Sequence, residues 1–230
     1  MLPFIISLII VTVFSIFLGG FIKKHSVKIY ILSLVISVIV FYIAYNSKKF
    51  GIERGSFLSE ILIYFTKGFI PTAIFIVVMF TGALNNKLKM AQNLLKIRGE
   101  LSIVASILMF SHIGLYLVRF INFTIPRILL GKHMPIKNYV VTFSGIIATI
   151  IMIPLFITSF MLIRKKMKGA TWKKLQKYSY LFYFSTYIHI AACAFTKFGL
   201  DYIKLSFYSI IFLIYTIMRL KKYKGKLQKA

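Results

Sequence analysis

Long apolar runs, separated by short polar segments that carry most of the cations, set the pattern of this chain. A helix that crosses a bilayer needs about 20 predominantly apolar residues. Seven stretches meet or approach that length: residues 2–22, 28–45, 60–84, 99–121, 139–162, 177–196 and 203–219. Because the connections are too short to hold a separate soluble domain, the pattern predicts an all-α fold, a polytopic membrane helical bundle of about seven transmembrane helices.

Composition places this bundle in the lipid bilayer. Hydrophobic residues make up 59% of the chain and charged residues 15%, and the mean hydropathy is +0.85. Such values do not describe a water-soluble domain. The first apolar stretch begins Met1-Leu2-Pro3-Phe4 and lacks the positive segment and the cleavage site of a signal peptide. We therefore expect it to remain as a membrane span.

The net charge of +26 is interpreted as a topology signal and not as a nucleic-acid-binding surface, because cations gather in the cytoplasmic loops of membrane proteins. Twenty Lys and Arg residues follow the first, third, fifth and seventh predicted spans, whereas nine follow the second, fourth and sixth. This asymmetry predicts that the N-terminus lies outside and the C-terminus in the cytoplasm, and we expect an integral protein of the bacterial cytoplasmic membrane.

The few acidic residues argue against several classes of membrane protein. The chain holds only Glu53, Glu60, Glu100 and Asp201, all at or near the ends of predicted spans. Ion-coupled transporters, proton pumps and intramembrane aspartyl proteases usually need a carboxylate deep in the membrane. The last span has only Lys204, at its edge, so it lacks the internal lysine of a retinal protein. No phosphate-binding loop, nucleophile elbow or HExxH motif is present, and we assign no catalytic residue.

Two histidines lie deep in apolar segments, where a histidine is costly without a partner. His112 follows Gly99 by thirteen residues, and His189 follows Lys177 by twelve. Both therefore lie roughly 18–20 Å from the inner membrane face. Equal depth on two helices is what the axial ligand pair of one haem iron requires. Two unrelated polar contacts remain the alternative, and two histidines are too few for a closed zinc site.

Other polar residues are interpreted relative to this pair. Tyr116 and Arg119 lie further out on the helix of His112, and Lys197 follows the helix of His189. They would contact the haem propionates if these point outward. His25 and His133 lie in predicted loops, where we expect them to be solvated. The single cysteine, Cys193, cannot form an internal disulfide and is interpreted as a small packing residue.

Several short motifs occur in a characteristic order. They are Phe80-Thr81-Gly82, Arg98-Gly99, Ser111-His112, Tyr116, Thr158-Ser159, Gly169, Trp172-Lys173-Lys174-Leu175-Gln176, Tyr180 and Ile188-His189. With these motifs the chain, from about Thr66 to Arg219, resembles the ferric reductase-like transmembrane domain. Within that family it resembles the haem-binding membrane subunit of the periplasmic methionine-sulfoxide reductase system.

The resemblance implies b-type haem, electron transfer across the membrane, and axial ligands at His112 and His189. It implies a ferric reductase-like haem-binding domain at residues 60–220, preceded by N-terminal transmembrane helices at 1–59 and followed by a basic cytoplasmic tail at 221–230. The first span is additional to the usual six of the family.

One departure from the family pattern bears on the number of haems. The family commonly has a histidine thirteen residues before the ligand that matches His189, and this chain has Gln176 there. Thirteen residues of helix span about 20 Å, the separation of two stacked haems in the ferric reductases and NADPH oxidases. An amide is a poor ligand for low-spin haem iron, and Arg98 cannot coordinate it. We therefore predict one haem b per chain, in the outer half of the membrane.

The sequence thus predicts an electron-transfer subunit of an oxidoreductase system. No flavin or nicotinamide domain is present, so the donor would be a quinol or a separate flavoprotein, and the acceptor a periplasmic or extracellular redox protein. FMN could bind the cationic loop through Arg164, Lys165, Lys166 and Lys173, or that loop is a topology signal alone. The rival hypothesis is a non-redox polytopic protein, a small transporter or a membrane anchor for a partner enzyme.

Overall fold

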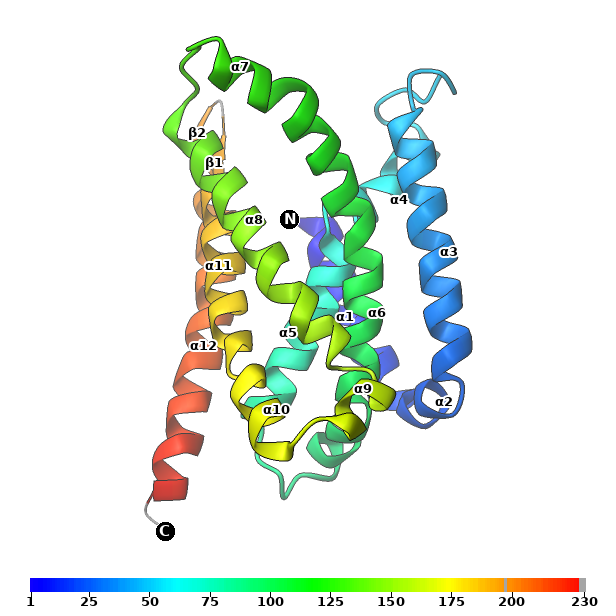
Figure 1. The fold of residues 1–230 in the computed structure, drawn as a ribbon, viewed down its shortest axis with the longest axis vertical. Coiled ribbons are helices and arrows are strands. Elements are labelled where there is room, and N and C mark those ends of the chain that lie inside the picture. The colour runs from blue at the N-terminus through cyan, green and yellow to red at the C-terminus, as the bar shows by residue number, and fades with distance from the viewer. Residues whose placement is uncertain (197, 228–230) are drawn as a thin grey trace. The chain divides into compact units, whose positions relative to one another are not determined.

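The computed structural model describes residues 1–196 and 198–227. Along these residues the elements are α1 (Leu2–Phe17), α2 (Gly19–Lys24), α3 (Ser26–Tyr45), α4 (Phe57–Thr66), α5 (Phe69–Ala83), α6 (Lys89–Arg119), the π-helical turn η1 (Phe120–Thr124), α7 (Ile125–Leu129), α8 (Ile136–Ile157), α9 (Met161–Lys166), α10 (Gly169–Gln176), α11 (Tyr178–Ala192), β1 (Phe195–Thr196), β2 (Gly199–Leu200) and α12 (Tyr202–Leu227). Apart from one two-stranded hairpin, every element is helical, which confirms the predicted all-α membrane bundle (Figure 1).

Within residues 1–196 and 198–227, five helical segments are long and apolar enough to cross a membrane. They are Ser26–Tyr45, Phe57–Ala83, Lys89–Leu129, Ile136–Ile157 and Tyr202–Gly225. The first and sixth predicted spans form shorter helices. The stretch 2–22 is divided at Leu18, just before the glycine pair Gly19-Gly20, and α1 has 16 residues. The stretch 177–196 forms the 15-residue α11, because the chain leaves the helix at Cys193 and enters β1.

The chain divides into two compact units. Unit 1 comprises Met1–Thr81 and Asn86–Pro126, and unit 2 comprises Gly82–Asn85 and the chain from Arg127 onward. The C-terminal end of α5 therefore belongs to unit 2.

Helix α6 is the central element of unit 1, and α1, α2, α3 and α4 all pack against it. Helix α3 approaches it closely at Gly114, where an added Cβ would lie 2.9 Å from the Phe41 ring of α3. Buried serines on α1, α3 and α6 also line the interior of this unit. Small residues let apolar helices approach closely, which is the usual way that membrane helices associate. This packing holds the middle of α6, including His112, in a defined position within unit 1.

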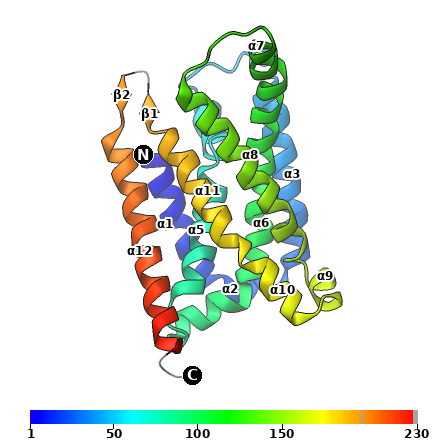
Figure 2. The same ribbon diagram turned by 60° about the vertical axis from the view of Figure 1, so that its left-hand side comes forward.

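In unit 2, α8 and α11 lie side by side along most of their length, and α12 packs against α11 (Figure 2). The Tyr187 hydroxyl of α11 lies 2.9 Å from the Ser209 hydroxyl of α12. Beyond α11, Cys193 is half-buried, and its N–H donates to the His189 carbonyl at 3.1 Å. The packing of α8 against α11 thus determines which residues of α8 lie next to His189.

Candidate functional site

His112 projects from α6 toward the junction of α4 and α5. Its Nδ1 lies 2.8 Å from the carbonyl oxygen of Thr66, the last residue of α4. Two residues later Gly68 has a φ of +70°, a left-handed conformation that favours glycine. This turn separates α4 from α5 and exposes the Thr66 carbonyl, which has no helical partner at the end of its helix. An added Cβ on Gly68 would lie 3.5 Å from His112 Nδ1, so the glycine also forms part of the wall against the ring.

His189 has the same local arrangement in unit 2. Its Nδ1 lies 2.9 Å from the carbonyl oxygen of Val141 on α8. Gly145 lies one turn further along α8, and an added Cβ there would come within 3.1 Å of His189 Nδ1 and 3.2 Å of Cε1. Only a glycine therefore leaves the ring room to sit this close to α8.

These contacts determine which ring nitrogen carries the proton. A carbonyl oxygen can only accept, so Nδ1–H donates in both histidines and, in the neutral ring, Nε2 carries the lone pair. Histidines that bind metals are usually held in this way, with the second nitrogen hydrogen-bonded to a carbonyl or carboxylate. The chemistry of both residues therefore fits an axial ligand of haem iron. His112 belongs to unit 1 and His189 to unit 2, and their use as a pair stays a prediction.

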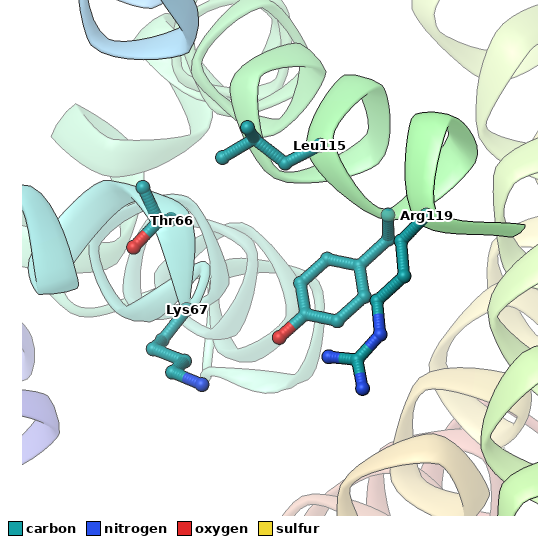
Figure 3. Close-up of a pocket in the computed structure, with 5 residues that line it drawn as sticks. Thr66, Lys67, Leu115 and Arg119 are labelled. Atoms are coloured by element: carbon teal, nitrogen blue, oxygen red, sulfur yellow. The ribbon is translucent and has the colours of Figure 1, made fainter. Parts of the chain in front are cut away.

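A cavity of about 190 Å³, open to the surface, lies within unit 1 next to Thr66 and Tyr116, which contact His112. Its walls are Thr66, Lys67, Leu115, Tyr116 and Arg119. Figure 3 shows the Lys67 ammonium and the Arg119 guanidinium extending toward the same space. The Tyr116 ring lies 4.6 Å from the His112 ring, measured between centroids.

This cavity brings together two of the three residues predicted to contact propionates, Tyr116 and Arg119. The third, Lys197, lies outside the described residues. Sequence reasoning missed Lys67, although a single cation inside the apolar run 60–84 was a signal that could have identified it. Whether any of them touches a haem stays a prediction.

The two histidines predicted to be solvated differ in their surroundings. His133 is exposed. His25 is half-buried at the end of α2, with its ring centroid 4.6 Å from that of Phe21. Its ring is therefore partly covered by its own helix.

The cationic loop after α8 is ordered around Trp172. The Trp172 indole N–H donates to the Thr158 carbonyl at 3.3 Å, which ties α10 to the end of α8. The Arg164 guanidinium lies 4.1 Å from the centre of the indole ring, a cation–π contact. Lys165, Lys166 and Lys173 are exposed. Of the four residues that could bind a flavin phosphate, Arg164 thus already has an aromatic partner.

Comparison with known proteins gives the family. A family model described as the ferric reductase like transmembrane component matches residues 67–187, more than half of the chain. The chain belongs to this family. An uncharacterized protein of Treponema pallidum (strain Nichols) is 30% identical over 233 residues, covering 97% of this chain and 61% of the relative. The chain thus spans less than two thirds of that relative's length. No solved structure gives a significant match.

Membership of the ferric reductase-like transmembrane family, together with the long apolar helices, identifies an integral membrane protein and points to membrane electron transfer. His112 and Gln176 lie inside the matched region, and His189 lies two residues past its end. The predicted boundaries at residues 60 and 220 stay a prediction, as does the closer likeness to the methionine-sulfoxide reductase subunit.

Proposed function

We propose that this protein is a haem b electron-transfer protein in which His112 and His189 are the axial ligands of a single iron. The proposal rests on one observation, that the two imidazole rings have the same hydrogen-bonding arrangement. Each donates Nδ1–H to a backbone carbonyl, at 2.8 Å for His112 and 2.9 Å for His189. Transmembrane domains of this family commonly bind haem, which supports the same assignment.

The two hydrogen bonds have a chemical consequence for a bound iron. When bound, haem supplies one-electron redox chemistry. A carbonyl partner on Nδ1–H makes Nε2 more basic and holds the ring in one orientation. A more basic imidazole favours the ferric over the ferrous state, so both hydrogen bonds would lower the reduction potential. The two hydrogen bonds would thus favour electron transfer from the haem to an acceptor of higher reduction potential.

We infer that electrons enter near the cytoplasmic face and leave to a periplasmic or extracellular redox protein. A haem in the outer half of the membrane would lie about 20 Å from the inner face, too far for one fast tunnelling step. The donor would therefore be a quinol that reaches into the bilayer, or a flavoprotein acting through an intermediate cofactor such as FMN at the loop after α8. A methionine-sulfoxide reductase is the candidate acceptor.

The test is the absorption spectrum of the protein purified from haem-replete cells. We expect sharp low-spin haem b bands and one haem per chain. His112→Ala and His189→Ala should each abolish the low-spin spectrum, because each removes one of two axial ligands. The matched controls, His25→Ala and His133→Ala, should retain it, as should Gln176→Ala.

A colourless wild-type protein would overturn the proposal in favour of a non-redox transporter or membrane anchor. A ratio near two haems, with a spectrum that partly survives His189→Ala, would contradict the single-haem assignment.

A further inference from the structure

The cavity beside His112 has the composition of an anion-binding site. Two cations and a phenol, Lys67, Arg119 and Tyr116, line a space of about 190 Å³ together with Thr66 and Leu115 (Figure 3). Leu115 supplies an apolar wall, and the Tyr116 hydroxyl can donate a hydrogen bond.

Two separate elements bring these groups to the same place. Tyr116 and Arg119 follow His112 on α6 by four and seven residues, so all three lie on one helix face. Arg119 is about 10 Å further along the helix axis than His112. Lys67 arrives from the turn between α4 and α5, directly after the residue whose carbonyl accepts from His112 Nδ1. The cavity therefore lies next to two residues that contact His112, Thr66 and Tyr116, and two cations complete its lining.

The charge of this cavity is not balanced by the described part of the chain. The side chains of Lys67 and Arg119 are exposed, and among the described residues neither side chain has a hydrogen bond or a carboxylate partner. Cations within membrane spans are costly and usually face a partner or a functional site. A guanidinium matches the two oxygens of a carboxylate, and an ammonium adds a further charge-assisted hydrogen bond. A carboxylate therefore fits this set of groups, and a phosphate is the alternative that the experiment must separate from it.

We propose that Lys67, Tyr116 and Arg119 form a carboxylate-binding pocket whose occupant is a haem propionate. This inference rests on the proposed function, and it adds Lys67 to Tyr116 and Arg119, two of the three residues expected from the sequence. Unit 1 would then hold the charged edge of the haem as well as one iron ligand. The two cations oppose the positive charge of the ferric state, so the pocket raises the reduction potential and partly offsets the effect of the histidine hydrogen bonds.

The experiment measures how fast haem leaves the protein for an excess of apomyoglobin. Protein from haem-deficient cells is loaded either with haem or with its dimethyl ester, which has no carboxylates. We expect Lys67→Met and Arg119→Gln each to speed the release of haem by roughly tenfold or more, because each removes a charge-assisted hydrogen bond. Release of the dimethyl ester should not change. Arg119→Lys should restore part of the slow release.

Arg127→Gln is the matched control, since it removes an exposed cation of α7 that does not line the cavity. Both pocket variants should also have a lower reduction potential than the wild type. Equal acceleration for haem and its ester would overturn the propionate assignment. So would release rates that depend on added anionic phospholipid and not on the propionates, which would assign the pocket to a lipid phosphate. A colourless wild type would instead overturn the proposed function itself.

Discussion

His112 and His189 lie on different helices in different units. Each ring nevertheless donates a hydrogen bond to a backbone carbonyl and lies next to a glycine. A backbone carbonyl cannot be removed by mutation, but the glycine can be changed. Substituting these glycines is therefore the most direct way to change the position of each proposed ligand.

Gly145→Ala should disturb His189 without touching its hydrogen-bonding atoms. The new methyl group would lie 3.1 Å from Nδ1, closer than side chains normally pack, so the ring must move away from α8. We expect a lower haem content and a shifted low-spin electron paramagnetic resonance signal. Gly169→Ala is the control, because an added Cβ there meets nothing within 4 Å. An unchanged signal in Gly145→Ala would mean that His189 is not an iron ligand.

At the scale of the elements, helices were predictable where apolar runs are long, because length and hydropathy decide whether a segment can cross a bilayer. The interruptions were harder to find. Lys67-Gly68 breaks the stretch 60–84 into α4 and α5, although apolar residues continue on both sides. The hairpin of β1 and β2 shortens the sixth predicted span in the same way.

The geometry of the two proposed ligands was only half predictable. The depth of each histidine follows from counting residues along a helix. Its hydrogen-bond partner does not, since 46 residues separate Thr66 from His112 and 48 separate Val141 from His189. No local pattern indicates which carbonyl will face a ring, because that choice depends on how neighbouring helices pack.

Helix α12 also stabilises unit 2 through its cations. Arg219 Nη1–H donates to the Gly82 carbonyl at 2.7 Å, and the Lys222 ammonium donates to the carbonyls of Gly82 and Leu84 at 3.0 and 2.7 Å. These groups satisfy carbonyls at the C-terminal end of α5, which have no partner within their own helix. The contacts therefore replace a conventional helix cap.

Replacing both cations, Arg219→Gln with Lys222→Gln, should lower the free energy of unfolding by about 1–3 kcal/mol, since hydrogen bonds from charged donors are lost. Thermal unfolding in detergent would measure the change. Lys221→Gln with Lys224→Gln removes the same charge from exposed positions of α12 and should have a much smaller effect. Equal effects of the two pairs would show that net charge, and not the capping contacts, stabilises this end.

At the scale of the whole molecule, the unequal distribution of cations predicts the orientation in the membrane. Twenty Lys and Arg residues follow the odd-numbered predicted spans and nine follow the even-numbered ones. The loop near Lys168 should therefore be cytoplasmic, and the loop near His133 should lie outside.

Reporter fusions test this orientation directly. A reporter that works only in the periplasm should be active after His133 and inactive after Lys168, and a cytoplasmic reporter should show the reverse. Periplasmic activity at Lys168 would invert the topology, and the proposed haem would then lie nearer the inner face.

Cys193 gives the wild-type chain a single site for attaching a spin label. It is the single cysteine of the sequence, it is half-buried, and it follows His189 by one helical turn. A nitroxide attached there needs no background cysteine to be removed. Ferric low-spin iron on His189 would shorten the spin relaxation of such a label, and reduction to diamagnetic ferrous iron would restore it. A label on Cys193 could therefore report the oxidation state of the proposed haem in intact membranes.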